Sequence, residues 1–453
     1  MIRSKYKIPF YNVILALTTL AILILLSIAL QARSCSSKRG RQFEDSDAAL
    51  WDDDAPLNWN ADMVSKSELV HALATVARLD PVGPVSDSCL PPPLEPVPPC
   101  SGQSAFTGRR LERPRRIVQM LLISFEGDTL EIALQESYDV VDFIFLVEST
   151  RTHSPKGEEG RSTKPLMWEA LRHTERFRFL PKDKVFYIVV DDVDMQKAVT
   201  AGEDDIWSVE ALQTIVGVQK IKSWANSTNV LQANDIFISG DIDEIIRRDT
   251  LNQMKWCELS DKLFSGALWM PLGNLNKAYR TDHAAPDLPY TYTLPTVFTW
   301  DVIASGQDDG RRKFSTQLQE ARGVSWKFVK GGIHLTNPSF VPSQILKQLC
   351  ATEYDGTAEI KNYTIGKIDK EQAFHYSLGP HPEWKRRQVS LSELDQTYSG
   401  WLEYVPWFLK CNPKRYPYWF GVNDQRNKAL LYVLKKLSMG QKYNLAEYLD
   451  KHL

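Results

Sequence analysis

The chain has 453 residues, of which 43% are hydrophobic and 24% are charged. This length and hydrophobic fraction suffice for one large or two ordinary globular domains. Its 54 Lys and Arg residues are balanced by 56 Asp and Glu residues, which gives a formal net charge of -2. A nucleic-acid-binding surface needs an excess of cationic side chains to replace counterions, so this balance argues against nucleic acid as a partner.

The first thirty residues have the pattern of a membrane anchor. Val13 to Leu30 contains no charged residue and follows Arg3, Lys5 and Lys7. With its flanking aromatic residues the run approaches the ~20 apolar residues that cross a bilayer. We therefore expect a cytoplasmic tail over residues 1–12 and a transmembrane signal anchor over residues 13–30. A cleaved signal peptide is the alternative, but the run is long for one and lacks a small-x-small cleavage site.

Two further features favour a luminal position for the rest of the chain. Asn226-Ser227-Thr228 and Asn362-Tyr363-Thr364 are acceptor sequons for N-glycosylation, which takes place in the secretory pathway. The six cysteines fit an oxidising compartment, although buried free thiols are an equally reasonable alternative. The pattern is that of a single-pass type II membrane protein.

Residues 31–116 are expected to form a luminal stem that is proline-rich and largely disordered. Six prolines lie between Cys89 and Cys100 and favour an extended polyproline conformation. One amphipathic helical pattern, from Met63 to Leu79, interrupts the polar composition. The stem ends in the basic run Arg113 to Arg116, which is either a solvated linker or a site for a luminal basic-site protease.

From residue 117 to residue 453, apolar runs of strand length alternate with segments of helical periodicity. The strand candidates are Ile117 to Ser124, Val140 to Val147, Val185 to Val190, Asp235 to Ser239 and Ala267 to Met270. The helix candidates are Leu166 to Phe177, Val209 to Ser223, Thr250 to Glu258 and Ser343 to Glu353. This alternation predicts an α/β domain with a mostly parallel central sheet, whose ligands collect beyond the carboxyl ends of its strands.

Two Asp-x-Asp motifs follow predicted strands. Asp241-Ile242-Asp243 comes after the run ending at Ser239 and leads directly into a helical pattern. Asp192-Val193-Asp194 follows another strand but leads into a less regular segment. Paired carboxylates on a turn offer the hard oxygen ligands that Mn²⁺ or Mg²⁺ prefers. A turn held between a strand and a helix is the better fixed of the two, which favours the later motif.

The later motif also carries a resemblance to a known family. The segment from Asp235 to Ile245 resembles the Asp-x-Asp-Glu-Ile segment of glycosyltransferase family 17, the β-1,4-mannosyl-glycoprotein 4-β-N-acetylglucosaminyltransferase family. Further matches in the family's order are Thr129-Leu130-Glu131-Ile132, Glu136 to Asp142, Val147-Glu148-Ser149, Thr152-His153-Ser154, Lys164-Pro165-Leu166 and Gly332-Ile333-His334. The similarity runs from about Leu122 to about Leu349. Departures lie at Ile246, Ile333 and residues 335–340, toward the expected acceptor end.

The resemblance implies a nucleotide-diphospho-sugar transferase (GT-A-like) fold and a metal-dependent, inverting reaction. N-acetylglucosamine would pass from UDP-GlcNAc to a mannose hydroxyl of an N-glycan in the Golgi. The alternatives are a transferase with a different donor or acceptor, and a catalytically silent luminal protein that binds glycans.

Five residues are candidates for the metal and for proton transfer. Asp241 and Asp243 would hold the Mn²⁺ or Mg²⁺ that bridges the diphosphate. The resemblance adds His334 as a third ligand, with a purely structural role as the alternative. Inversion requires a carboxylate near the attacking hydroxyl, for which Glu244 and Glu353 are the candidates. Glu244 is also placed to support the metal ligands from behind.

Four residues are candidates for binding the UDP donor. Glu148 ends an apolar strand where an acceptor would reach the uracil or ribose, although a helix cap is the alternative reading. His153 continues the loop over that position, and Asp191 ends the neighbouring strand. Gly240 precedes the metal motif, where the backbone approaches the ligand.

Overall fold

The computed structural model describes residues 64–81, 83–86, 88–96, 98–153, 163–194, 208–280, 288, 290–307, 310, 327–336, 340–351, 388–390, 403–422 and 424–452. All of these belong to one unit that runs from Leu57 to Leu453. The predicted tail and anchor, the sequon at Asn362 and the candidate base Glu353 lie outside the described residues. Among the described helices, none combines the length and apolar character that a bilayer crossing requires.

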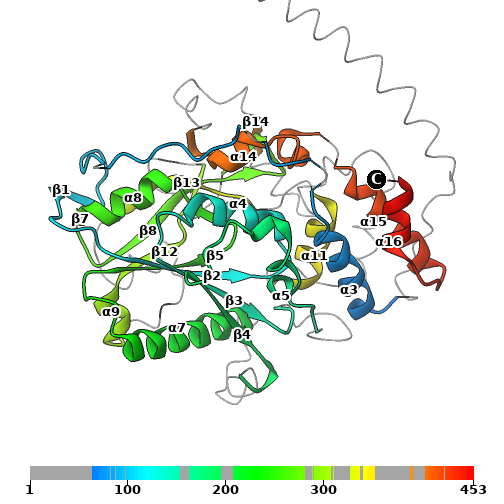
Figure 1. The fold of residues 1–453 in the computed structure, drawn as a ribbon, viewed down its shortest axis with the longest axis horizontal. Helices are drawn as coiled ribbons and strands as arrows, with labels where there is room; N and C mark the ends of the chain where they lie inside the picture. The colour runs from blue at the N-terminus through cyan, green and yellow to red at the C-terminus, as the bar shows by residue number, and fades with distance from the viewer. Residues whose placement is uncertain are drawn as a thin grey trace, which may run out of the picture. The chain divides into compact units, whose positions relative to one another are not determined.

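A mixed sheet forms the centre of this unit (Figure 1). Its nine strands are β2 (Ile117–Ile123), β3 (Phe143–Ser149), β4 (Val185–Val190), β5 (Ile236–Asp241), β6 (Glu244–Ile246), β8 (Leu263–Trp269), β11 (Thr291–Tyr292), β12 (Thr296–Thr299) and β13 (Phe328–His334), as far as the described residues show. The strand order is β4-β3-β2-β5-β12-β8-β13-β6, and β11 pairs with β8. The α/β prediction is confirmed.

The sheet is not mostly parallel, which corrects part of that prediction. The neighbours β4, β3, β2 and β5 are parallel, as are β13 and β8. The pairs β5-β12, β12-β8, β8-β11 and β13-β6 are antiparallel. The parallel half, where β2 and β5 are neighbours, is the part that carries the Asp241 motif.

Helices cover both faces of the sheet. They are α3 (Lys66–Ala77), α4 (Gly127–Ser137), α5 (Met167–Leu171), α7 (Ser208–Thr228), α8 (Arg248–Trp256), α9 (Trp300–Ala304), α11 (Val341–Cys350), α14 (Trp407–Cys411), α15 (Arg426–Ser438) and α16 (Leu445–His452). Every residue of β2 is buried, because alternate side chains enter two different cores. Val118, Met120 and Leu122 pack under α7 and α9, whereas Leu121 and Ile123 face α4 and the C-terminal helices.

The segment before β2 is part of the folded unit, which corrects the predicted stem. Helix α3 begins with a capping box between Ser65 and Glu68 and buries one face against α11 and α15. Strand β1 (Phe106–Arg110) pairs with β7 (Cys257–Leu259). The amphipathic pattern that was assigned to a disordered stem therefore belongs to a core helix. The folded unit therefore includes the described residues from 64 to 116, which the predicted stem had contained.

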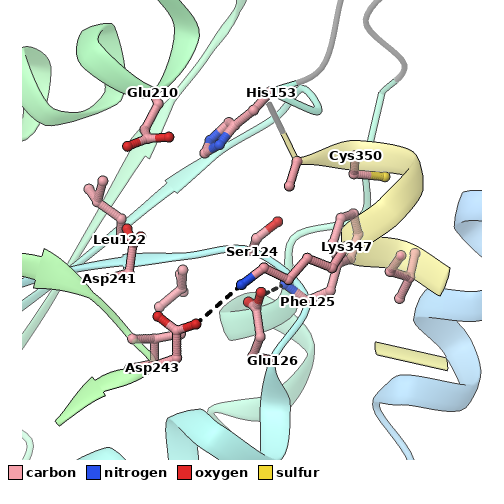
Figure 2. Close-up of a pocket in the computed structure, with 14 residues that line it drawn as sticks. Leu122, Ser124, Phe125, Glu126, His153, Glu210, Asp241, Asp243, Lys347 and Cys350 are labelled. Carbon is pink, nitrogen blue, oxygen red and sulfur yellow. Dashed lines mark hydrogen bonds and ion pairs between the residues drawn. The ribbon is translucent and has the colours of Figure 1, made fainter. Parts of the chain in front are cut away.

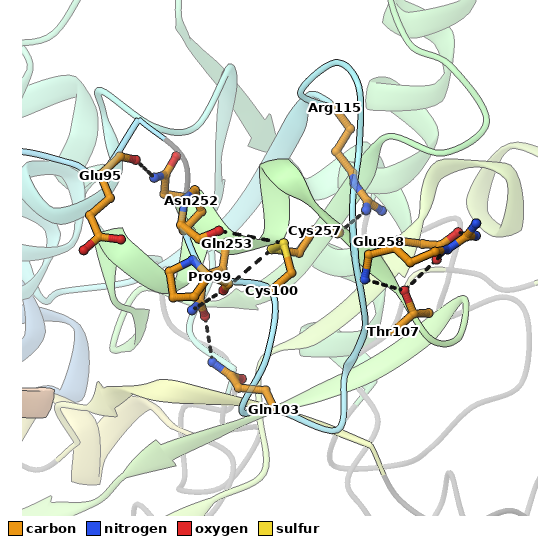
Figure 3. Close-up of a disulfide and its surroundings, with 12 residues drawn as sticks. Glu95, Pro99, Cys100, Gln103, Thr107, Arg115, Asn252, Gln253, Cys257 and Glu258 are labelled. Carbon is orange, nitrogen blue, oxygen red and sulfur yellow. Dashed lines mark hydrogen bonds and ion pairs between the residues drawn. A yellow bond between two sulfur atoms is a disulfide. The ribbon is translucent and has the colours of Figure 1, made fainter.

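Two disulfides fasten this segment to the rest of the unit. Cys100 bonds to Cys257 across 157 residues, and Cys89 bonds to Cys411 across 322 residues. Hydrogen bonds surround the first disulfide, including Gln103 Nε2 to Gln253 Oε1 at 2.9 Å (Figure 3). The segment is thus held covalently at both ends of its proline-rich loop.

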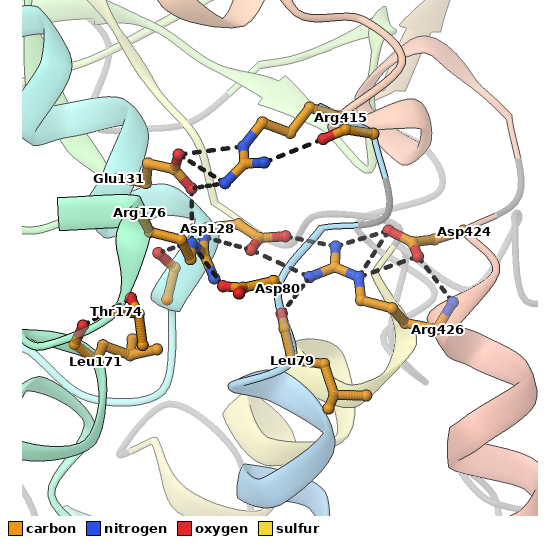
Figure 4. A network of polar contacts seen from close by, with 12 residues as sticks. Leu79, Asp80, Asp128, Glu131, Leu171, Thr174, Arg176, Arg415, Asp424 and Arg426 are labelled. Carbon is orange, nitrogen blue, oxygen red and sulfur yellow. Dashed lines mark hydrogen bonds and ion pairs between the residues drawn. The ribbon is translucent and has the colours of Figure 1, made fainter. Parts of the chain in front are cut away.

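The C-terminal helices are joined to α4 by a buried group of charges that we call the ionic cluster (Figure 4). It consists of Asp128, Glu131, Arg176, Arg415, Asp424 and Arg426. Burial alone would raise the pKa of Asp128, but Arg426 and Arg176 outweigh burial and hold that pKa at about 2.

The small strands β9 (Pro271–Leu272), β10 (Asn274–Tyr279) and β14 (Gln388–Ser390) form a separate sheet.

Candidate active site

A cavity of about 600 Å³, open to solvent, lies at the carboxyl ends of β2 and β5. Its floor is formed by Leu122 and Ile123 of β2, with the loop from Ser124 to Glu126 and the turn from Asp241 to Asp243 beside them. Helix α11 forms one wall, and His153 and Glu210 stand above the strands (Figure 2). The position is where open α/β sheets bind ligands.

Asp241 and Asp243 both line the cavity. The turn that carries them is fixed by backbone hydrogen bonds. The Ile242 N–H donates to Leu122 O at 3.1 Å, and the Leu335 N–H donates to Asp243 O at 2.8 Å. These bonds tie the turn to β2 on one side and to the end of β13 on the other.

Glu244 and Gly240 support this turn. The Glu244 side chain is buried, and its Oε2 accepts a hydrogen bond from the Asp241 N–H at 2.9 Å. This is the supporting position that was the alternative to its role as a base. A Cβ at Gly240 would lie 2.6 Å from Pro295 Cβ and 2.7 Å from Glu244 Oε2. Gly240 therefore allows close packing behind the turn, and neither residue is among those that line the cavity.

His334 is brought to Asp243 by strand pairing. It lies opposite Glu244 in the antiparallel β13-β6 pair, one residue from the acidic turn. His334 Nε2 is 3.4 Å from Asp243 Oδ2, and its ring stacks on Tyr292 with the ring centres 4.4 Å apart. Within the described part of the chain, His334 Nδ1 is buried without a hydrogen-bond partner.

These donor atoms suit a divalent cation, although they do not form a complete ligand shell. Two ligands at about 2.1 Å from one octahedral ion are about 3 Å apart, which is close to the Asp243–His334 separation. Carboxylate and imidazole are both accepted by Mn²⁺. Among the described residues, however, no group of three or more His, Cys, Asp or Glu side chains is arranged to hold a metal ion. The three-ligand arrangement is therefore not preformed.

Glu148 occupies a structural position. It is buried at the end of β3, and Oε1 accepts hydrogen bonds from Lys164 Nζ at 2.7 Å and from the Met167 N–H at 2.6 Å. Oε2 accepts from the Trp168 N–H at 3.2 Å and from the Tyr187 hydroxyl at 2.9 Å. From within β3, this carboxylate accepts hydrogen bonds from the first turn of α5 and pairs with a buried lysine, so it is not itself the N-cap of a helix. It does not line the cavity.

The other two donor candidates have different positions. His153 lines the cavity, and its Nε2 lies 2.7 Å from Gln213 Oε1, which fixes the ring. Asp191 instead caps the turn that follows β4, because its Oδ1 accepts from the Val193 and Asp194 N–H groups at 2.9 and 3.0 Å. His153 therefore remains a candidate for donor contact, whereas Asp191 has a local structural role.

The rival acidic motif is an exposed ion-paired turn. Asp192 accepts two hydrogen bonds from the guanidinium of Arg151, at 2.8 and 2.7 Å, and Arg151 thereby lowers the pKa of Asp192. Asp194 lies 3.5 Å from Lys220 Nζ. Neither carboxylate lines the cavity, so the preference for the later motif agrees with the geometry.

The sequence did not identify five polar residues that line the cavity: Ser124, Glu126, Glu210, Lys347 and Cys350. Glu126 comes from the β2–α4 loop and Glu210 from the first turn of α7. Lys347 and Cys350 come from α11, and burial raises the pKa of the Cys350 thiol to about 12, so it stays neutral. The position of Glu126, just after a buried strand, was the one local signal that pointed to the sheet edge.

The comparison with known families found a match for the part of the chain that forms the parallel half of the sheet. Residues 104–266 match glycosyltransferase family 17. The predicted resemblance is confirmed over this range, which contains β2 to β6 and the Asp241 turn. His334 and Lys347 lie beyond it, so the family match covers only one side of the cavity.

Curated relatives support the same match. The β-1,4-mannosyl-glycoprotein 4-β-N-acetylglucosaminyltransferase of Rattus norvegicus is 30% identical over 142 residues, which are 30% of this chain and 23% of the relative. The Homo sapiens and Mus musculus proteins of the same name are each 29% identical over 142 residues. The match thus spans less than a quarter of the relatives' length.

A solved structure, that of 4-diphosphocytidyl-2C-methyl-D-erythritol synthase, is similar over 51% of this chain and 99% of that chain. Its sequence identity is 13% and its TM-score is 0.26, which is too low to carry an argument.

Proposed function

We propose that the protein is a metal-dependent inverting glycosyltransferase that moves N-acetylglucosamine from UDP-GlcNAc to a mannose hydroxyl of an N-glycan. The observation that carries the proposal is the Asp241–Asp243 turn. Both carboxylates face one cavity at the carboxyl edge of the parallel strands, inside the segment that matches family 17. A GT-A-like fold and a Golgi type II topology, with residues 13–30 as the anchor, complete the proposal.

In the proposed reaction, residues of this chain would bind the metal, contact the donor and remove a proton. Asp241 and Asp243, with His334 from β13, would hold Mn²⁺ or Mg²⁺. The bound ion would neutralise charge on the departing diphosphate. Glu244 fixes the Asp241 backbone, and His153, which lines the cavity, would contact the donor. The described lining offers two further carboxylates, Glu126 and Glu210, for removing the proton of the attacking hydroxyl.

The proposal is tested by donor turnover. Full-length protein from a secretory host is incubated with UDP-sugars, an N-glycan acceptor and Mn²⁺, and UDP release is measured. We expect release with UDP-GlcNAc above that with UDP-galactose or UDP-glucose, and loss of release in EDTA. Glycan binding without release from any donor would instead support a glycan-binding protein.

Substitution of the two remaining carboxylates identifies the base. Loss of transfer in Glu126→Gln or Glu210→Gln, with UDP affinity unchanged, would assign the role to that residue. Full activity in both variants would exclude both carboxylates.

A further inference from the structure

Lys347 is a cationic side chain placed directly beside the acidic turn (Figure 2). Its Nζ donates to Thr336 Oγ1 at 2.8 Å and lies 3.4 Å from Asp243 Oδ2. The same Asp243 oxygen is 3.4 Å from His334 Nε2. An ammonium and an imidazole thus converge on the oxygen that the proposed metal would use.

The position of Lys347 is set by the packing of α11. Ile345, Leu346 and Leu349 are buried, and the helix packs against α3 and α15. Helix α3 belongs to the segment that the two disulfides fasten. Because the helix is braced in this way, the Lys347 backbone stays beside the cavity, while its four-carbon stem lets the ammonium move between nearby anions.

A divalent cation at Asp243 would change the surroundings of this ammonium. Two positive charges a few ångströms apart repel one another in a partly buried site, so Lys347 alone lowers the affinity of Asp243 for a cation. A diphosphate relieves the repulsion, since its oxygens can accept hydrogen bonds from the ammonium and also contact the cation. Lysine is a common phosphate-binding residue for this reason.

We propose that Lys347 binds an oxygen of the donor's diphosphate and that its charge couples metal binding to nucleotide binding. This inference rests on the proposed function. Lys347 acts as a binding residue: its ammonium contacts Asp243 before the donor arrives and the diphosphate afterwards. The coupling favours occupation of the site by metal and donor together, and disfavours metal alone.

The test measures binding instead of turnover. Isothermal titration calorimetry gives the dissociation constants of Mn²⁺ alone, of UDP in EDTA, and of Mn²⁺ with UDP present, for full-length protein. In Lys347→Met, we expect Mn²⁺ alone to bind about tenfold more tightly. UDP should bind roughly ten- to a hundredfold more weakly, as for loss of one charge-assisted hydrogen bond.

Two variants serve as controls. Lys347→Arg keeps the charge, so its UDP affinity should stay within about threefold of the unaltered protein. Lys182→Met removes an exposed lysine in the turn before β4 and should leave all three constants unchanged. Thermal unfolding of each variant shows that it is folded when binding is measured.

The outcomes separate the inference from the proposed function. If the unaltered protein binds Mn²⁺ and UDP but Lys347→Met has the same constants, Lys347 does not couple them and the inference is wrong. If the unaltered protein binds neither UDP nor Mn²⁺, the proposed function fails and the inference fails with it.

Discussion

The cavity and the ionic cluster are built from the same residue types but differ in charge balance. The described lining of the cavity contains four carboxylates, on Glu126, Glu210, Asp241 and Asp243, and one lysine, Lys347. The cluster pairs three buried carboxylates with three guanidinium groups. In the cluster, arginines of the protein supply the positive charge, and the ion pairs hold the C-terminal helices against α4. In the cavity, the excess of carboxylates leaves room for a cation from outside, which we interpret as the functional difference.

The largest effect is expected from breaking the balanced region. Arg426 donates from Nη2 to Asp128 Oδ2 and to Asp424 Oδ2, each at 2.6 Å. Arg426→Met leaves two carboxylates buried without this partner, so the free energy of unfolding should fall by about 3–5 kcal/mol. Chemical denaturation measures the change. The control Arg178→Met removes an exposed guanidinium paired with Glu175 and should change stability by less than about 1 kcal/mol.

The next largest effect is expected from the disulfide that fastens the segment before β2. Replacing Cys100 and Cys257 together by serine removes a crosslink across 157 residues. The free energy of unfolding should fall by about 2–4 kcal/mol, because the unfolded chain gains conformational freedom when the crosslink is lost. If this segment were a disordered stem, the double variant would unfold at the same denaturant concentration as the parent, and that outcome would contradict the fold described here.

The cavity should respond in activity and not in stability. Asp243→Asn keeps the shape of the side chain but removes its charge, so UDP release should fall by at least about 100-fold. The free energy of unfolding should change by about 1 kcal/mol or less. The matched control is Asp192→Asn in the exposed acidic motif, which should keep activity within about twofold. A larger loss of activity in Asp192→Asn than in Asp243→Asn would contradict the assignment of the metal to the Asp241–Asp243 turn.

The sequence predicted features that depend on neighbouring residues better than features that depend on residues far apart in the chain. Strands β2, β4 and β5 are continuous apolar runs, and the Asp241 turn directly follows one of them, so local pattern was sufficient. The hydrogen bonds of Glu148 could not be predicted because its partners, Lys164 and the start of α5, lie 16 or more residues further along the chain. Lys347 was missed for a similar reason, since more than 100 residues separate it from Asp243.

The resemblance to family 17 located the segment that contains the Asp241 turn, but it did not identify the role of each matching residue. Several residues that carry it are structural: Glu131 belongs to the ionic cluster, and Glu136 accepts hydrogen bonds from two backbone N–H groups. The pairing of Cys89 with Cys411 could not be read from spacing, because four or more cysteines allow several pairings. Chemistry was predictable where it lies next to a strand, and packing over long separations was not.

Glu136 gives the smallest expected effect. It is a buried carboxylate that has no guanidinium partner among the described residues, which distinguishes it from the carboxylates of the ionic cluster. Its Oε1 accepts from the Arg248 N–H at 3.1 Å and its Oε2 from the Trp407 N–H at 3.0 Å, which joins α4 to α8 and α14. Burial raises the pKa of Glu136 to about 7, although these N–H groups oppose the shift. In Asp128 the arginines reverse the effect of burial, and in Glu136 two backbone dipoles do not.

The sign of the resulting pH dependence follows from the raised pKa. Between the unfolded value of 4.5 and the folded value of about 7, the folded state binds more protons than the unfolded state, so stability falls as pH rises. From pH 5.5 to pH 7.5 this group should lower the free energy of unfolding by about 2 kcal/mol. Glu136→Gln cannot titrate, so its stability should lack this component whatever its absolute value. Urea denaturation of both proteins at the two pH values measures the difference. If the free energy of unfolding changes equally with pH in both proteins, Glu136 is already ionised in the folded protein at pH 5.5.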